Sequence, residues 1–208
     1  MLSRRCGRPA SAARGVGLVE VMVTLVLLVA LLSQVLPTIS DWLQGLKLRN
    51  AAEAMRGGLE RARLEALKRN SNVGFWIVSD ANSKVPGNDC AQSSSSAAWV
   101  VSVLNPAGKC AAAPALTGDP QLVQRSTALE NLPGLTVSAL SAGGGAANHV
   151  TFNGLGQVVA DVDPIQTIDF SLASGAGRRL RVVVEGGGAV RMCDRDVGAT
   201  DPRACPAL

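Results

Sequence analysis

The sequence predicts an α+β protein in which one long N-terminal helix packs on an antiparallel β-sheet head. Three observations predict this fold class: an apolar run near the N-terminus, an amphipathic segment that continues from it, and a series of short strand-like segments separated by turns rich in Gly, Asn and Pro. The 208 residues leave room for one membrane segment and one globular domain. We therefore expect one anchor and one head.

Residues 16–36 form the apolar run, which has about the 20 residues that a helix needs to cross the hydrocarbon core of a bilayer. Four arginines and no acidic residue precede it: Arg4, Arg5, Arg8 and Arg14. The positive-inside rule then places the N-terminal leader in the cytoplasm. Glu20 lies within the run, where a carboxylate costs roughly 2.5–3.5 kcal/mol at mid-membrane and so marks a functional position. A secretory signal would be shorter, with its cleavage site on the far side, so the run is predicted to stay on the protein as its anchor.

The basic charge of the chain comes from this leader. The formal net charge is +4 and the pI is about 9.0, but without the four leader arginines 16 basic residues face 16 acidic ones. The basicity is therefore a targeting feature and does not indicate an anionic partner. Aromatic residues make up 3% of the chain and Tyr is absent, a poor match to surfaces that stack single-stranded nucleic acid.

The residues Arg14-Gly15-Val16-Gly17-Leu18-Val19-Glu20 resemble the processing site of type IV pilins and type II secretion pseudopilins. The resemblance implies that a prepilin peptidase cuts between Gly15 and Val16 and methylates the new N-terminus at Val16. Glu20 would then be the fifth mature residue, where the family has a Glu that is thought to pair with the terminal amine of a neighbouring subunit. Pro37 is the twenty-second residue after the cut, where the family commonly has a helix-bending Pro.

That resemblance divides the N-terminal part of the chain and implies its surroundings. Residues 1–15 are the expected prepilin leader peptide and residues 16–37 the expected transmembrane and assembly helix. The implied location is the bacterial inner membrane, crossed once, with the head in the periplasm. The implied partners are the prepilin peptidase and the other pilins or pseudopilins of a filament, and no cofactor is implied.

Residues 38–70 are expected to continue the helix into the head with one buried stripe. Apolar residues recur largely at spacings of three or four: Ile39, Trp42, Leu43, Leu46, Ala51, Ala54, Met55, Leu59, Ala62 and Ala66. Gly57 and Gly58 interrupt the pattern, and two interpretations stay open: a weak point of the helix, or a close contact with the sheet. The stretch from Ala62 to Val73 contains Ala-Arg-Leu-Glu-Ala and resembles the helix end and first strand of the GspH/FimT branch of the pilin family.

Residues 71–208 are expected to form a GspH/FimT-like, β-rich head with one antiparallel sheet. The expected strands are Asn72 to Ser79, Ala98 to Leu104, Leu135 to Leu140, Val150 to Phe152, Gln157 to Ala160, Thr167 to Leu172, Arg179 to Glu185 and Ala189 to Cys193. Leu180, Val182 and Val184 are expected to face the helix. Segments 82–97, 111–120 and 141–148, which are rich in small and polar residues, are expected to be surface loops.

Four cysteines remain after the leader, all on the side predicted to be extracytoplasmic: Cys90, Cys110, Cys193 and Cys205. Disulfides persist in such a compartment. Four cysteines allow three pairings, and we favour the one that is local in sequence, Cys90 with Cys110 and Cys193 with Cys205. A zinc site is not expected, because there is no CxxC and His149 is the only His.

The sequence favours a structural role over catalysis. His149 stands beside a Gly-rich loop without a recognisable catalytic motif, so no catalytic residue is proposed and the chain is not expected to be an enzyme. The interpretation is therefore a minor pilin or pseudopilin of a type IV pilus or a type II secretion system, acting in filament initiation, protein secretion or pilus biogenesis. These two machines use the same kind of subunit, and the sequence leaves the choice open.

The alternative is a FimT-like minor pilin that binds DNA for natural transformation. Some such pilins capture DNA through a C-terminal Gly-Arg-x-Arg motif, whereas the corresponding place here reads Gly188-Ala189-Val190-Arg191, without the first Arg. Arg191 and Arg195 are the candidate contacts to phosphate, but nearby acidic residues offset much of this charge. DNA is therefore a partner that the sequence permits but does not favour.

Overall fold

The computed structural model describes residues 17–82, 85–127, 134–160, 163–175 and 177–206 and, for residues 34–41, the helical backbone alone. The chain forms two compact units that divide between Ser40 and Asp41. The described part of the first unit contains the beginning of the helix. The second contains the rest of the helix and both β-sheets.

Helix α1 spans Leu18–Arg69, and residues at both of its ends stabilise it. Glu20 lies in its first turn, and Lys68 and Arg69 lie in its last turn, which is the arrangement that the helix dipole favours. It ends at Asn70, whose φ of 48° is left-handed. The backbone N–H of Asn70 donates to the carbonyl of Leu67 (3.3 Å), and that of Ser71 donates to the carbonyl of Ala66 (3.2 Å). This Schellman-type cap satisfies carbonyls that the helix end would leave free and turns the chain into the first strand.

The described part of the head contains two antiparallel sheets instead of the one expected. The five-stranded sheet has the order β2-β1-β3-β4, with β6 pairing on β1. Its strands are β1 (Val73–Ser79), β2 (Ala91–Gln92), β3 (Trp99–Ser102), β4 (Leu122–Arg125) and β6 (His149–Phe152). The four-stranded sheet has the order β5-β7-β8-β9. Its strands are β5 (Leu135–Leu140), β7 (Thr167–Leu172), β8 (Leu180–Val184) and β9 (Val190–Asp194).

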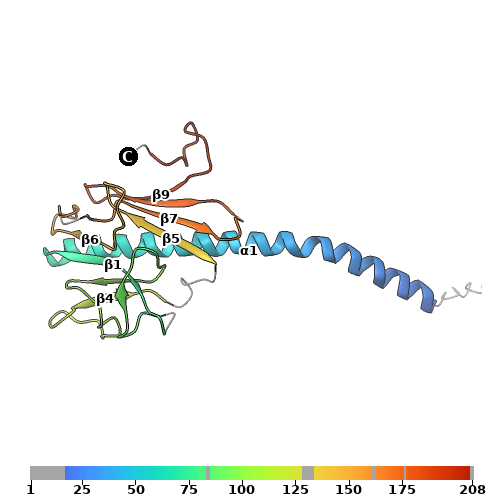
Figure 1. The fold of residues 1–208 in the computed structure, drawn as a ribbon, viewed down its shortest axis with the longest axis horizontal. Helices are drawn as coiled ribbons and strands as arrows, with labels where there is room; N and C mark the ends of the chain where they lie inside the picture. The colour runs from blue at the N-terminus through green and yellow to red at the C-terminus, as the bar shows by residue number, and fades with distance from the viewer. Residues whose placement is uncertain (1–16, 83–84, 128–133, 161–162, 176, 207–208) are drawn as a thin grey trace, which may run out of the picture. The chain divides into compact units, whose positions relative to one another are not determined.

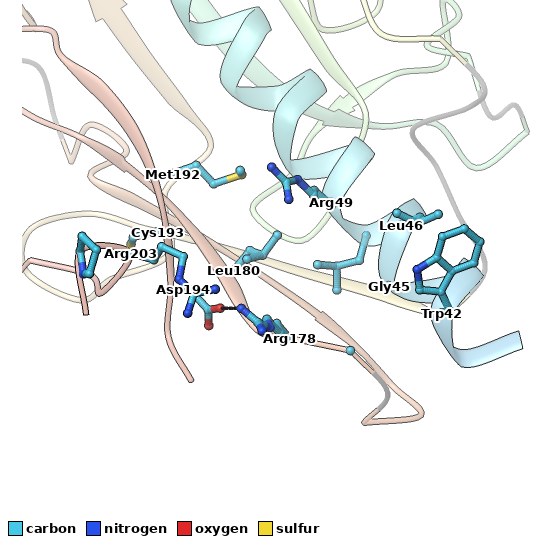
Figure 2. Close-up of a pocket in the computed structure, with 13 residues that line it drawn as sticks. Trp42, Gly45, Leu46, Arg49, Arg178, Leu180, Met192, Cys193, Asp194 and Arg203 are labelled. Atoms are coloured by element: carbon cyan, nitrogen blue, oxygen red, sulfur yellow. Dashed lines mark hydrogen bonds and ion pairs between the residues drawn. The ribbon is translucent and has the colours of Figure 1, made fainter. Parts of the chain in front are cut away.

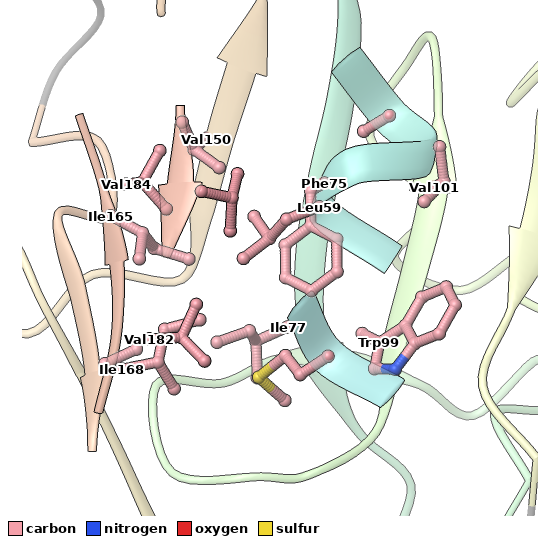
Figure 3. Close-up of a cluster of buried hydrophobic side chains, with 14 of the residues drawn as sticks. Leu59, Phe75, Ile77, Trp99, Val101, Val150, Ile165, Ile168, Val182 and Val184 are labelled. Carbon is pink, nitrogen blue, oxygen red and sulfur yellow. The ribbon is translucent and has the colours of Figure 1, made fainter. Parts of the chain in front are cut away.

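Figure 1 shows the two sheets beside the second part of helix α1, and side chains from all three form one hydrophobic core, part of which Figure 3 shows. The helix contributes Met55 and Leu59, both fully buried. The five-stranded sheet contributes Phe75, Ile77 and Trp99, among others, and the four-stranded sheet contributes Ile168, Val182 and Val184. The α+β class with a long N-terminal helix packed on antiparallel sheet is therefore confirmed. Val182 and Val184 lie in this core as expected, and Leu180 packs at its edge.

Several strand boundaries differ from those expected, each for a local reason. Strand β2 lies inside an expected loop and has only two residues, so no alternating pattern could reveal it. Strand β4 follows a cis Asp119–Pro120 bond and was missed, because only Leu122 of its four residues is buried. Residues 157–160, expected as a strand, form a single bridge between Phe152 and Val158 instead.

Gly58 meets the sheet closely, which decides between the two interpretations of the glycine pair. A Cβ at Gly58 would lie 2.9 Å from a ring carbon of Phe75 and 3.0 Å from ring carbons of Trp99, whereas a Cβ at Gly57 would meet nothing within 4 Å. The helix is continuous across both residues. Gly58 therefore lets the aromatic residues of β1 and β3 approach the helix.

Candidate functional site

The residues of the predicted processing and assembly site are only partly described. Gly15 and Val16 lie outside the described residues. Glu20 lies in the first turn of α1 and is exposed. Pro37 lies within the bounds of α1, and its side chain is outside the described part. Of these four residues, Glu20 is therefore the one whose side-chain surroundings the structure describes, and it lies on the surface of an apolar helix segment.

The helix segment around Glu20 presents large apolar side chains to the outside. Those between Leu18 and Leu32 are 49–77% exposed. The hydroxyls of Thr24 and Ser33 donate to carbonyls of their own helix, at 2.9 Å to Val21 and 2.8 Å to Ala30. A contiguous exposed apolar surface of this kind marks a site of contact with protein or lipid. As far as residues 17–206 are described, no helix has the length and apolarity that a membrane crossing requires.

A groove in the head is lined by the first helical turns of the second unit and by the last two strands (Figure 2). Its volume is about 740 Å³. The lining residues are Trp42, Gly45, Leu46, Leu48, Arg49, Gly177, Arg178, Leu180, Met192, Cys193, Asp194, Pro202 and Arg203. The expected buried stripe of the helix is wrong here, because Trp42 is 64%, Leu43 44% and Leu46 39% exposed. Trp42 and Leu46, which line the groove, thus form an exposed apolar edge on it.

Arginines supply most of the charge of this groove. Arg178 Nη1 lies 3.0 Å from Asp194 Oδ2, and the Asp194 side chain is 6% exposed. Arg203 pairs with Asp201 at 2.7 Å, and the hydrogen bond from Arg203 lowers the pKa of Asp201 to about 2. Arg49 pairs with Glu53 at 2.7 Å. The surface therefore combines an apolar floor with cationic groups that are each balanced by one carboxylate.

Two disulfides join Cys90 to Cys110 and Cys193 to Cys205, so the structure contains the pairing favoured from the sequence. Cys193 lines the groove, and Pro202 and Arg203, which also line it, lie inside the Cys193–Cys205 loop. This disulfide thus holds one wall of the groove. The Cys90–Cys110 pair lies in a separate small core with Val78, Ala98, Val100 and Leu122.

The two candidate DNA contacts are both engaged with carboxylates. Arg191 Nε lies 3.1 Å from Glu185 Oε1, and Arg195 Nη1 lies 2.9 Å from Asp169 Oδ2. Arg181 also binds Asp169, through two nitrogens at 2.6 and 2.8 Å. The positive charge expected here is therefore locally compensated.

Arg63 joins the helix to two turns of the head, a role that the sequence did not reveal. Its Nε donates to the carbonyl of Gly156 at 3.0 Å. A Cβ at Gly188 would lie 1.8 Å from that same carbonyl oxygen, so the turn between β8 and β9 needs a glycine there. Arg63 lies in the Ala-Arg-Leu-Glu-Ala stretch, whose Ala62 and Ala66 are fully buried, but that stretch does not indicate its partner Gly156.

The second polar residue of that stretch, Glu65, is buried in an ion pair. Its side chain is 6% exposed and lies 2.7 Å from Arg69 Nε, with Lys68 at 3.8 Å. The hydrogen bond from Arg69 is the largest cause that holds the pKa of Glu65 below its ordinary value. Glu65 thus links side chains within the last turns of the helix.

His149 has a packing role in β6. Its ring stacks on Trp76 of β1, with centroids 4.8 Å apart and planes 11° from parallel. Its Nδ1 lies 3.0 Å from Asn148 Oδ1. Among the described residues, no group of His, Cys, Asp and Glu is arranged to hold a metal ion.

Two solved structures resemble the chain weakly. Both are of the type IV minor pilin FimU of Pseudomonas aeruginosa. One is 17% identical, with a TM-score of 0.45 over 72% of this chain and 90% of that chain. The other is 15% identical, with a TM-score of 0.41 over 69% of this chain and 90% of that chain. At these TM-scores the likeness assigns no function. No curated protein matches the chain.

The family comparison is stronger. The model of the family described as type II transport protein GspH matches residues 51–188, which is more than half of the chain. The match includes the buried part of α1, both sheets up to the turn after β8, and the Arg63–Gly156 contact. The chain belongs to the GspH family.

Proposed function

We propose that this protein is a minor pilin or pseudopilin, a non-catalytic structural subunit of a type IV pilus or a type II secretion pseudopilus. The observation that carries the proposal is the GspH family match over residues 51–188, in a head that packs on the last half of a 52-residue N-terminal helix. The exposed apolar surface between Leu18 and Leu32 supports it, because such a surface requires a lipid or protein cover.

The proposed organisation follows the sequence. Residues 1–15 are removed by the prepilin peptidase, and residues 16–37 anchor the chain in the inner membrane and later pack among other pilins. Residues 38–70 carry the helix into the head, and residues 71–208 form the head in the periplasm. The two disulfides support an oxidising compartment for this head.

Glu20 is proposed to be the assembly residue of the anchor. It is the carboxylate of the first helical turn and is surrounded along the helix by apolar side chains. A carboxylate in such surroundings needs a cationic partner that is desolvated with it. The methylated amine of Val16 on a neighbouring subunit would supply that partner, and Pro37 would adjust the path of the helix beyond it.

The proposal is tested by N-terminal mass spectrometry of the protein extracted from membranes. The expected mature chain begins at methylated Val16 and retains the apolar segment. A chain that keeps its leader, or one that is cut beyond Leu36, would contradict the pilin assignment. A Gly15→Leu variant serves as the control, because a blocked cut should leave the leader on an otherwise folded protein.

A further inference from the structure

The groove lined by Trp42, Arg178 and Met192 has the size and chemistry of a ligand site. Its volume of about 740 Å³ falls within the range of roughly 300–1,000 Å³ that small-molecule sites occupy. Leu48 on its floor is 1% exposed, and Leu180 and Met192 pack against the main core. The floor is therefore a firm apolar surface that belongs to the core of the head.

The charged side chains that line the groove are three arginines and one aspartate. The side chains of Arg49, Arg178 and Arg203 are 64%, 60% and 56% exposed. The ion pairs of Arg49 and Arg203 are largely exposed, and such pairs contribute only about 0–1 kcal/mol, so these guanidinium groups can turn to a second anion at little cost. Arg178 keeps one nitrogen on the buried carboxylate of Asp194 and has further N–H groups for a second anion. A guanidinium matches the oxygens of a phosphate with two parallel hydrogen bonds.

Trp42 connects this groove with the membrane segment along the chain. It follows Leu36, the last residue of the apolar run, by six residues, which even fully extended reach only about 20 Å. The headgroup layer adds about 5–8 Å on each side of the hydrocarbon core. Trp is enriched in that layer, because its ring is apolar and its N–H is polar. The 64% exposure of Trp42 is consistent with such a position.

We propose that this groove binds an anionic phospholipid from the periplasmic leaflet, with its phosphate held by Arg178 and Arg203 and its apolar part against Leu180 and Met192. The inference rests on the membrane anchor of the proposed function. It adds a ligand class to that function: a lipid bound by the head while the subunit waits in the membrane. Trp42 and Leu46 then lie against lipid instead of water.

The test uses the full chain in lipid nanodiscs that contain phosphatidylcholine and phosphatidylglycerol in equal amounts. Native mass spectrometry after release from the discs counts the lipids that stay on the protein. The expected result is retention of phosphatidylglycerol over phosphatidylcholine by about tenfold. Both lipids offer a phosphate, but the ammonium group of choline cancels the negative charge of phosphatidylcholine and is repelled by the arginines.

The variant Arg178→Gln/Arg203→Gln should lose that preference. The matched control is Arg56→Gln/Arg191→Gln, which removes two arginines from exposed ion pairs with Glu60 and Glu185 outside the groove. The control should keep the preference of the unchanged protein. Thermal unfolding of both variants, followed by fluorescence of the buried Trp99, verifies that each is folded.

Each outcome bears on a different part of the inference. Equal retention of both lipids by the unchanged protein overturns the lipid site and leaves the groove to a neighbouring subunit. An equal loss in the test and control variants also overturns it, because general charge would then explain the preference. A chain that fails to enter nanodiscs overturns the proposed anchor, and the lipid site with it. A chain that enters nanodiscs without preferring either lipid is consistent with the proposed anchor and contradicts only the proposed lipid site.

Discussion

Two stretches of helix α1 differ in the size and the burial of their apolar residues. Every described residue from Gly17 to Ser33 is exposed, although most are Leu and Val. From Leu48 to Ala66 five of the nine buried positions are Ala or Gly, and these nine positions form the helix side of the core of the head. The large residues of the first stretch therefore need partners outside the chain, whereas the small residues of the second admit strands of the same chain.

The largest expected difference between the two stretches is the effect of removing a carboxylate, Glu20 from the first or Glu60 from the second. Replacing Glu20 with Leu removes the proposed partner of a neighbour's terminal amine, so incorporation into filaments should fall roughly a hundredfold, as expected for about 3 kcal/mol from a broken buried pair. Replacing Glu60, an exposed carboxylate of the second stretch, with Leu should leave incorporation unchanged. Immunoblots of sheared filaments against total membranes measure both. Normal incorporation of the Glu20 variant would refute the assembly role.

Leucines of the two stretches should differ in what they contribute to the stability of the head. Leu59 is fully buried, so Leu59→Ala should lower the free energy of unfolding by about 2–5 kcal/mol. Leu27 is 59% exposed, and Leu27→Ala should leave the unfolding of the head unchanged. Urea unfolding in detergent, followed by Trp fluorescence, compares them. Equal losses would mean that the first stretch also supports the head.

The sequence predicted the helix and most strands of the head, but it did not predict how far the helix stays covered. Trp42, Leu43 and Leu46 continue the spacing of Ala51 and Met55, yet they are exposed, since the apolar pattern does not reveal where the sheets end along the helix. The second sheet was missed for a similar reason. Alternation identifies a strand but not which sheet it joins, and both sheets face the same helix.

The candidate site was predictable where a single residue type determines the chemistry. The local cysteine pairs follow from loops of 20 and 12 residues along the chain. The groove and the Arg63–Gly156 contact are tertiary features. Arg63 and Gly156 are 93 residues apart in sequence, so neither residue reveals the other. The ion pairs of Arg191 and Arg195 depend on strand register in the same way.

Glu65, which lies in the second stretch, should make the stability of the head depend on pH. Its pKa is lowered in the folded protein, chiefly by the hydrogen bond from Arg69, from an ordinary value of 4.5. The ion pair therefore stabilises the fold above that value, and the contribution is lost as the pH falls through the lowered pKa.

The matched variant is Glu65→Gln. Its free energy of unfolding should be about 1.5–3 kcal/mol lower than that of the unchanged protein at neutral pH, and the difference should be smaller in acid. Urea unfolding from pH 7 to pH 3 measures the gap between the variant and the unchanged protein. A gap that stays constant over this range would show that the charge of Glu65 does not contribute. Glu20→Gln should leave the same curve of the head unaltered.

Gly57 and Gly58 test the packing of the second stretch with substitutions that each add one carbon atom. Gly58→Ala adds a methyl group against Phe75 and Trp99, rings that are 0% and 3% exposed and cannot move aside. This crowding costs about 1–3 kcal/mol, which the better helix propensity of Ala offsets by about 1 kcal/mol. Gly57→Ala has open space and should gain up to about 1 kcal/mol from propensity alone. The midpoint of urea unfolding should therefore fall or stay level for the first variant and rise for the second. If both variants gain equally, the helix is not in close contact with the sheet at Gly58, and the small residues of the second stretch serve helix formation instead of packing.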